Sequence, residues 1–310
     1  MSCRKGARVH GRTLVIVNPM ARHGVTKSLV PLIVSLLDGH LDYDLVLTKH
    51  PGHATQMAAD AGVYDQIVAA GGDGTVNEAL NGIMRLPAAD RPALTVLPTG
   101  SGNDYRRTLG ISTDLPSAVR QILGGRRARM DVGIVNGMYF ANSLAIGLDA
   151  RVTARAAEIK STTGWSGLPL YLRALMYVLF RQFYAHRVTL SLDGEPASDR
   201  ELLLVAITNG PTYGGGFKIT PSAVGDDGVF DVCIIGKIGL AGALWRLPFV
   251  VVGRHTRMRP VSMSHHTSLR LESDAPIEAQ ADGEVMLSTT YDVRIEPLGV
   301  EVIVPERWAT

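Results

Sequence analysis

A glycine-rich turn between a buried strand and a helix constrains this chain more than any other feature of its sequence. Gly71-Gly72-Asp73-Gly74-Thr75 follows the apolar run Gln66–Ala70 and leads into helical spacing from Asn77 to Met84. Glycines in such a turn permit positive φ and let backbone N–H groups approach a phosphate, and the helix dipole favours the same anion. The turn therefore predicts nucleotide chemistry. It leaves three roles for Asp73: a Mg²⁺ ligand, a ribose contact, or a residue that shapes the loop.

Short apolar strands alternate with helical segments from Thr13–Val17 to Leu115–Leu123. This order predicts an α/β N-terminal domain with a parallel sheet and helices on both faces. Ligands bind such sheets at the carboxyl ends of the strands, where two more polar turns fall. They are Asn18-Pro19-Met20-Ala21-Arg22 and Pro98-Thr99-Gly100-Ser101-Gly102-Asn103-Asp104. The second turn offers hydroxyls, glycines and an amide beside the first, as a nucleotide cleft requires.

Beyond Gly124-Gly125 the pattern changes to strand-like runs separated by turns such as Asn136-Gly137, which predicts antiparallel pairing. We expect a C-terminal antiparallel β-sandwich domain, a division into residues 1–128 and 129–310, and inserted helices. The expected strands are Met130–Val135, Tyr139–Ile146, Arg187–Leu192, Glu201–Thr208, Phe230–Ile235, Thr267–Leu271, Ile277–Ala281, Tyr291–Pro297 and Val300–Val304. The expected helices are Ala150–Lys160 with Leu170–Phe183, and Leu240–Val252. The sequence leaves open whether the last residues fold back onto the first domain.

Composition narrows the class of protein. The 310 residues include 31 basic and 29 acidic ones, and this near balance argues against a nucleic-acid binder. Cys3 and Cys233 are the only cysteines, which fits a reducing cytosol and no disulfide framework. No apolar run is long enough to span a bilayer. We expect a cytoplasmic protein, with at most a peripheral contact at the inner membrane face. The basic clusters at Arg4–Arg12 and Arg126–Arg129 favour a solvated surface over a lipid-headgroup patch.

Carboxylates in the second half could serve chemistry or simply form turns. Asp282-Gly283-Glu284 suits a hairpin turn, but one of its carboxylates is also placed to accept a proton from an attacking hydroxyl. Asp226-Asp227-Gly228 suits a solvated turn or a Mg²⁺ site. Asp104, Asp131 and Asp149 are further candidates without a spacing argument. The nine histidines form no metal-binding pattern.

Taken together, these segments resemble the diacylglycerol kinase catalytic family, in particular the bacterial lipid kinases related to sphingosine and ceramide kinases. The matching segments run in the family's order from about residue 13 to 305. They are Val17-Asn18-Pro19, Gly71–Glu78, Leu97–Asp104, Asp131-Val132-Gly133, Phe140–Ser143, Gly147–Ala150, Gly214–Pro221, Asp226–Asp231 and Asp282-Gly283-Glu284. The resemblance implies an NAD kinase/diacylglycerol kinase-like α/β domain, a β-sandwich domain, and ATP between them. It also implies a role in phospholipid metabolism.

The resemblance also implies roles for individual residues. Glu284, Asp282 and Asp73 are assigned to the reacting centre, with Glu284 the proton acceptor and Asp282 its rival. A Mg²⁺ site is assigned to Asp227 with main-chain oxygens of Val224 and Val229. The ATP site is assigned to Asn18, Pro19, Met20, Ala21, Arg22, Thr48, Gly71, Gly72, Asp73, Gly74, Thr75, Val76, Asn77, Thr99, Gly100, Ser101, Gly102 and Asn103. Arg22 and Val285 depart from the family pattern and bear on phosphate contact and substrate choice.

The leading hypothesis is an ATP- and Mg²⁺-dependent kinase that phosphorylates a lipid hydroxyl at a membrane surface. An NAD kinase or sugar-phosphate kinase is the alternative enzyme, and a non-catalytic nucleotide or lipid sensor is the alternative from another class. Leu168–Phe183, with Trp165, Tyr171 and Tyr177, is either a wall of an acyl-chain pocket or ordinary core packing. The sequence decides neither the lipid nor whether the protein forms a homodimer.

Overall fold

The computed structural model describes residues 11–165 and 167–308, apart from the side chain of Leu168. The chain divides into two compact units. Of the described residues, the first contains Gly11–Gly100, Leu109–Arg129 and Val300–Trp308, and the second contains Ser101–Thr108 and Met130–Gly299. Cys3, Arg4, Lys5 and Arg8 lie outside the described residues.

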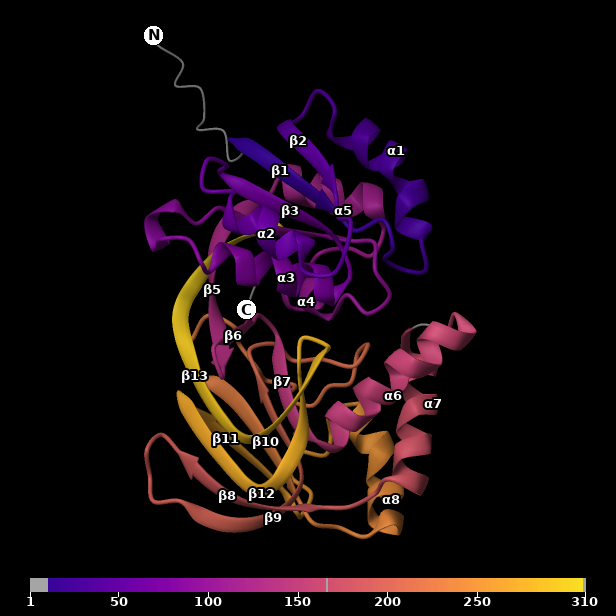
Figure 1. Ribbon diagram of the computed structural model, residues 1–310, viewed down its shortest axis with the longest axis vertical. Coiled ribbons are helices and arrows are strands. Elements are labelled where there is room, and N and C mark those ends of the chain that lie inside the picture. Colours follow the sequence, from indigo (N-terminus) through magenta and orange to yellow (C-terminus); the bar gives the residue numbers. More distant parts are fainter. Residues whose placement is uncertain (1–10, 166, 309–310) are drawn as a thin grey trace. The chain divides into compact units, whose positions relative to one another are not determined.

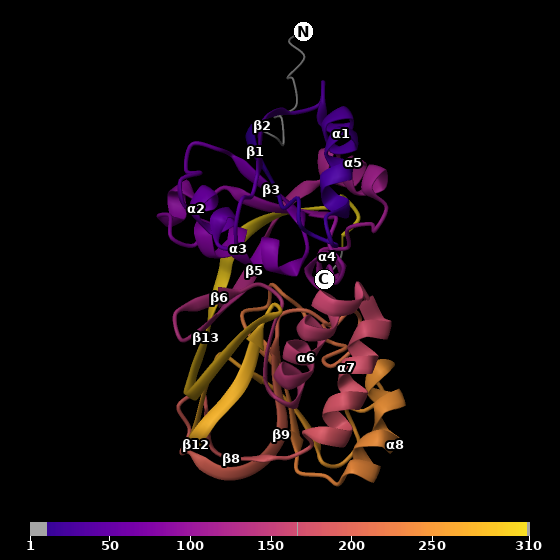
Figure 2. The same ribbon diagram turned by 45° about the vertical axis from the view of Figure 1, so that its right-hand side comes forward.

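The first unit is a sheet with helices on both faces (Figures 1 and 2). Its elements are β1 (Arg12–Val17), α1 (Val25–Leu37), β2 (Asp42–Leu47), α2 (His53–Ala59), β3 (Gln66–Gly71), α3 (Asp73–Ile83), η1 (Ala88–Asp90), β4 (Ala93–Pro98) and α5 (Leu115–Leu123). β1 lies between β2 and β3, β3 pairs with β4, and all these pairings are parallel. β3 and β4 are buried at all six positions, because helices cover both sides of the sheet.

The second unit consists mainly of antiparallel strands, with three long helices on one side. Its elements are α4 (Asp104–Thr108), β5 (Arg126–Val135), β6 (Met138–Phe140), β7 (Ser143–Gly147), α6 (Leu148–Thr163), α7 (Gly167–Arg181), β8 (His186–Leu192), β9 (Ser198–Thr208), β10 (Phe230–Gly236), α8 (Leu240–Val251), β11 (Val261–His266), β12 (Ser268–Ala281) and β13 (Glu284–Val304). β5 and β13 each run through both units, and in the first unit Val302 of β13 pairs in parallel with Leu94 of β4.

Four strands of the second unit close a ring, because β7 and β8 each pair with both β9 and β12. Apolar residues from all four strands share one buried cluster, including Leu144, Ile146, Val188, Leu190, Val205, Ile207, Leu271 and Ile277. β10 extends the sheet from β9, and β11 follows β10. Burial of this apolar area is the main source of stability for the unit.

Helices α6, α7 and α8 lie side by side next to this sheet (Figure 2). A second cluster joins them through residues such as Val152, Leu175 and Val178, with Leu244 and Leu247 of α8 packed against it. Leu203 and Ile235 of the sheet face the helices in a third cluster, which also contacts Val250 of α8. Among the described residues, no helix has the length and hydropathy to cross a bilayer.

Three expectations from the sequence are wrong in detail. The expected strand Tyr139–Ile146 is broken into β6 and β7, because the N–H groups of Ala141 and Asn142 donate to the carboxylate of Asp282 instead of a neighbouring strand. The runs expected as four strands after Thr267 form two long ones, β12 and β13. α4 and β11 were not expected. Their signals are weak, since α4 has five residues and β11 reads Val-Ser-Met-Ser-His-His.

Candidate active site

Three loops of the first unit meet at the carboxyl ends of parallel strands. β1 ends at Val17, β3 at Gly71 and β4 at Pro98, and the register aligns Gly71 with Pro98. Backbone and side-chain hydrogen bonds join the loops that follow. Asn18 Nδ2 donates to Thr75 Oγ1 at 3.1 Å, and Gly100 N donates to Gly71 O at 2.9 Å. The glycine turn is thus joined to the starts of the other two polar turns, at Asn18 and Gly100.

Gly71 allows this close approach because it lacks a side chain. A Cβ built on Gly71 would lie 2.3 Å from Thr75 Oγ1, which no real contact allows. Thr75 lies in the first turn of α3, whose N-terminus follows Gly72 without a side-chain cap. The N-terminal end of a helix attracts anions through its backbone N–H groups and its dipole. Half-buried Asp73 lies in the same first turn, where its charge also complements the dipole.

The loop after β4 carries a buried hydroxyl that suits a bound nucleotide. Thr99 is 3% exposed, and its Oγ1 has no hydrogen-bond partner among the described residues. Its carbonyl oxygen accepts a hydrogen bond from Thr26 Oγ1 of α1 at 3.1 Å. A buried polar atom without a partner is costly unless a ligand or water satisfies it. This orphaned hydroxyl and the cradle at Gly71 fit ATP phosphates or ribose.

The remaining residues assigned to ATP divide between the two units. Thr48 N donates to Val17 O, which brings the end of β2 to the same edge, and Val76 and Asn77 are buried in α3. Pro19 to Arg22 form the loop after β1, with Met20 and Arg22 exposed. Ser101, Gly102 and Asn103 group with the second unit instead, as does α4.

Asp104 explains why its segment packs with the second unit. Its Oδ2 accepts a hydrogen bond from Gly215 N at 2.8 Å, and its Oδ1 pairs with Arg107. Arg107 also donates to Gly215 O at 3.3 Å. Burial raises the pKa of Asp104 despite these partners. Asp104 therefore holds the 101–108 segment against the 214–216 glycine loop.

The turn between β12 and β13 is fixed by the carboxylate of Asp282. Asp282 Oδ2 accepts Ala141 N at 2.6 Å, and Oδ1 accepts Asn142 N at 3.0 Å and Ser143 N at 2.9 Å. Three backbone donors stabilise a carboxylate strongly. Asp282 has φ 48° and Gly283 has φ 93°, as a two-residue hairpin with a type I′ turn requires.

Glu284 differs from Asp282 in its surroundings. It is the first residue of β13 and is exposed, whereas Asp282 is half-buried against three amides. A proton acceptor must reach a substrate hydroxyl. The geometry therefore distinguishes two carboxylates that the sequence left as rivals: Asp282 positions the turn, and Glu284 is presented by it.

A buried carboxyl is linked to the same turn. Gln280 Nε2 donates to Asp149 Oδ2 at 3.1 Å, and Gly283 N donates to Gln280 Oε1 at 2.8 Å. Asp149 lies in the first turn of α6, and burial raises its pKa to about 7, while the bond from Gln280 opposes the shift. Gln280 was not predicted. Its only signal is a polar residue within the apolar end of β12, two positions before Asp282.

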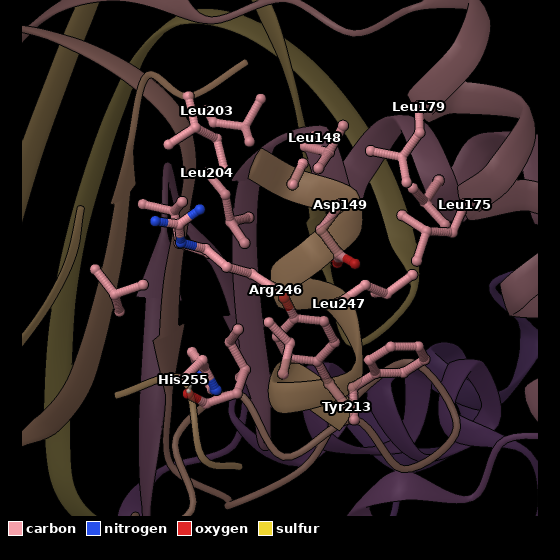
Figure 3. A pocket seen from close by; sticks show the side chains of 18 of the residues that line it. Leu148, Asp149, Leu175, Leu179, Leu203, Leu204, Tyr213, Arg246, Leu247 and His255 are labelled. Atoms are coloured by element: carbon pink, nitrogen blue, oxygen red, sulfur yellow. Dashed lines mark hydrogen bonds between the residues drawn. The ribbon is translucent and has the colours of Figure 1, made fainter. Parts of the chain in front are cut away.

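Asp149 lies at the wall of an apolar cavity in the second unit. The cavity contains about 760 Å³ of empty space, including open solvent at its mouth. Figure 3 shows the Asp149 carboxylate among leucines of α6, α7 and α8. Tyr171, Leu175 and Leu179 of α7 line it, which supports the pocket-wall interpretation of this helix. Trp165 and Tyr177 do not line it: both are exposed, because they lie on the outer side of the helical layer.

The predicted Mg²⁺ residues lie in the loop before β10. Asp227 is exposed, and its Oδ1 accepts Val229 N at 3.2 Å. The neighbouring Asp131 accepts Gly228 N and Leu298 N, and its pKa is raised by burial and by the charges of Asp227 and Asp226. In the described part of the chain, no three His, Cys, Asp or Glu side chains converge as metal ligands. The unbalanced negative charge nevertheless fits a cation held by Asp227 and backbone oxygens.

Comparison with known proteins defines the class. Residues 12–135 match the diacylglycerol kinase catalytic domain, and residues 142–304 match the YegS C-terminal NAD kinase beta sandwich-like domain. A curated diacylglycerol kinase of Staphylococcus saprophyticus is 31% identical over 278 residues, which cover 88% of each chain. One from Staphylococcus aureus strain JH9 is 30% identical over 88% of this chain and 86% of its own. The two domains are those of a kinase. The chain belongs to the diacylglycerol kinase catalytic family.

Solved structures agree with this assignment. A diacylglycerol kinase from Bacillus anthracis superposes with a TM-score of 0.73 at 25% identity, covering 94% of this chain and 96% of that chain. A second crystal structure from the same organism gives a TM-score of 0.82, also at 25% identity, over 98% of both chains. An NAD kinase from Archaeoglobus fulgidus, solved with ATP, shares the fold alone, with a TM-score of 0.51 at 12% identity.

Proposed function

We propose that this protein transfers the γ-phosphate of ATP to a hydroxyl group of a lipid. The observation that carries the proposal is the link between an apolar cavity and a presented carboxylate. Asp149 in the cavity wall bonds to Gln280, and Gln280 bonds to the backbone of Gly283, the residue before Glu284. An acyl chain in the cavity would thus end next to the turn that carries the base.

The residues divide the reaction between them. Glu284 accepts the proton of the lipid hydroxyl while the hydroxyl oxygen forms a bond to the γ-phosphorus of ATP. The bond between the γ-phosphorus and the β–γ bridging oxygen breaks, which releases ADP. Asp282 holds the turn through its three amides. The loops at Asn18 and Gly71 bind the phosphates, and Thr99 supplies a hydroxyl to the nucleotide. Bound Mg²⁺ would supply charge neutralisation to the phosphates. A further Mg²⁺ at Asp227, Val224 and Val229 would stabilise the second unit.

Two alternatives make different predictions. An NAD kinase also uses a glycine-rich turn of this kind, and a sensor would bind ATP without turnover. The apolar cavity favours a lipid acceptor over NAD, because a polar dinucleotide gains little from leucine side chains. The exposed Glu284 favours an enzyme over a sensor.

The test offers purified protein and ATP–Mg²⁺ to a total lipid extract and, separately, to NAD. We expect mass spectrometry to find phosphorylated lipids with a free hydroxyl in the substrate, and Glu284→Gln to abolish them. NAD phosphorylation with an unchanged lipid extract would establish the first alternative. ATP binding by calorimetry with no product in either reaction would establish the sensor.

A further inference from the structure

Helix α8 is apolar around its whole circumference, yet none of its residues is buried. It reads Leu-Ala-Gly-Ala-Leu-Trp-Arg-Leu-Pro-Phe-Val-Val, with Arg246 its only charged residue. A surface helix normally presents a polar face to water, and a helix apolar on all sides normally lies in a core or in lipid. Leu247 and Val250 face the cavity, whereas Trp245 points outward and is 60% exposed. The outer face of α8 is therefore an apolar surface in need of a partner.

Helix α7 continues this surface. Its inner residues join the helical cluster, and its exposed residues recur at helical spacing: Arg173, Met176, Tyr177, Phe180 and Arg181. Phe180 is 59% exposed. Trp165, just before α7, and Val252, just after α8, are exposed too. We call this set, with Trp245, the α7–α8 surface.

Arginines accompany the exposed aromatic rings of the α7–α8 surface. Arg155 lies 4.0 Å from the ring centroid of Tyr177, Arg173 lies 4.9 Å from that of Trp165, and Arg246 lies 5.3 Å from that of Trp245. Tryptophan and tyrosine favour the interface of a bilayer, where one part of the ring is apolar and another is wet. Arg246 donates to Gly242 O and Arg259 O, and Arg155 pairs with Glu158. The exposed guanidinium groups of Arg173 and Arg181 can instead bind phosphates through two parallel hydrogen bonds.

Charge identifies the partner. The segments 159–192 and 232–271, which contain α7 and α8, carry none of the 29 acidic residues. They carry ten of the 31 basic ones: Lys160, Arg173, Arg181, Arg187, Lys237, Arg246, Arg254, Arg257, Arg259 and Arg270. The rest of the chain is net acidic. Four basic groups here or next to these segments, Arg155, Arg187, Lys237 and Arg270, pair with glutamates that lie just outside the segments. The excess of cationic and aromatic groups over acidic ones still matches the headgroup region of an anionic bilayer.

We propose that the α7–α8 surface docks the protein onto an anionic lipid bilayer. The inner side of the same helices lines the cavity, so a docked protein would take its acceptor from the bilayer through the helical layer. This second step rests on the proposed function, but docking does not. The basic cluster at Arg126–Arg129 is less suited, because Trp308, the ring next to Arg126, is half-buried and Arg127 pairs with Glu301.

Tryptophan fluorescence tests the orientation in the full chain without ATP. One protein keeps only Trp245, through Trp165→Phe and Trp308→Phe, and a matched control keeps only Trp308, through Trp165→Phe and Trp245→Phe. Vesicles of phosphatidylcholine with 30% phosphatidylglycerol and brominated acyl chains are added. We expect quenching of Trp245, and no quenching of Trp308, which packs against Gly110 in the first unit. Quenching of Trp308 alone would place the bilayer elsewhere and overturn the proposal.

Vesicle sedimentation tests whether the aromatic and basic residues of the α7–α8 surface carry the binding. We expect Trp245→Ser with Phe180→Ser, and separately Arg173→Glu with Arg181→Glu, each to weaken binding on the order of tenfold or more. The control pairs alter equally exposed residues elsewhere: Val63→Ser with Leu287→Ser, and Arg85→Glu with Arg200→Glu. Equal loss in variants and controls, or no binding of the unmodified chain, overturns the proposal.

Two further readouts distinguish docking from dimerisation and from the kinase activity itself. If the lipid-free protein is a dimer that Trp245→Ser dissociates, the surface is an interface between copies and the proposal is wrong. Phosphorylation of a lipid dispersed in detergent micelles is measured in parallel. Docking variants that keep this activity but lose activity on vesicles support docking. Absence of phosphorylation with normal vesicle binding contradicts only the proposed kinase function.

Discussion

The candidate binding features of the two units are built from different groups. In the first unit they are backbone groups: Gly71, Gly100 and the N-terminus of α3 lie close behind the ends of β3 and β4, and Gly100 N donates to Gly71 O. In the second unit side chains from distant segments meet, as Asp149 and Gln280 do across 131 residues of chain. A loop of backbone amides requires glycines in a run, which sequence shows. A network of side chains forms between residues that are far apart in the chain, and the sequence does not show which of them meet.

The largest expected effect separates the two carboxylates of the turn. We expect Glu284→Gln to lower kcat by about 10²–10⁴-fold with little change in ATP affinity or stability, because glutamine keeps the size of this exposed side chain and cannot accept the proton. Asp282→Asn should lower both kcat and stability, because its carboxylate accepts three backbone N–H groups. Single-turnover kinetics and urea unfolding measure the two effects.

Glu195→Gln is the control, since Glu195 is exposed in a loop of the same unit. The division of labour fails if Asp282→Asn unfolds at the same urea concentration as the unmodified protein. It fails equally if Glu284→Gln keeps full turnover.

The second prediction concerns the backbone site of the first unit. Gly71→Ala places a methyl group against Thr75 Oγ1, so the loop must open, and we expect ATP affinity to fall by about 10–100-fold. Gly62→Ala is the matched control, since its added Cβ would have no neighbour closer than 3.7 Å. Calorimetry with a non-hydrolysable ATP analogue measures both.

If Gly71→Ala fails to fold, Thr99→Ala still tests whether these loops bind ATP, because it removes only one hydroxyl. Its predicted cost is a smaller loss of ATP affinity with unchanged stability. Unchanged affinity in both variants would mean that nucleotide binds elsewhere.

The third prediction uses the raised pKa of Asp149. Between about pH 4 and pH 7 the unfolded chain releases this proton while the folded chain keeps it, so stability falls as pH rises. Asp149→Asn removes this dependence. Relative to the unmodified protein, the variant should therefore gain about 2–3 kcal/mol of unfolding free energy between pH 5 and pH 8.

The pKa of Asp193 is shifted in the opposite direction, so its effect on stability with pH has the opposite sign. Burial opposes its ionisation, but hydrogen bonds from His266, Ser268 and Thr267 outweigh burial and lower its pKa to about 2. Its contribution is lost only as pH falls from about 4 to 2. Asp193→Asn should therefore leave the pH 5 to pH 8 difference unchanged in urea titrations, and a change there would contradict the assignment to Asp149.

Sequence predicted the elements of the first unit well and those of the second less well, for a physical reason. Buried parallel strands such as Gln66–Gly71 are apolar at nearly every position, so they are visible as runs. β6 and β7 were read as one strand, because nothing local shows that Asp282, 140 residues away from Asn142, takes the amide hydrogens between them. The glycine turns and the Asp282-Gly283-Glu284 turn were visible. The different surroundings of Asp282 and Glu284, from which we infer their roles, depend on burial, which only the fold supplies.

The smallest expected effect tests whether the cavity and the turn are coupled. Gln280→Leu keeps the volume but removes both hydrogen bonds, to Asp149 and from Gly283. We expect kcat to fall about tenfold and ATP affinity to stay constant, because the turn loses a contact worth about 1–2 kcal/mol. Gln66→Leu is the matched control. Gln66 is an equally buried glutamine, bonded to Thr13 at the opposite end of β3 from the glycine turn, so its loss should lower stability alone. Equal kcat values for the two variants would show that Gln280 only stabilises the fold, and the side-chain network would then be no more than core packing.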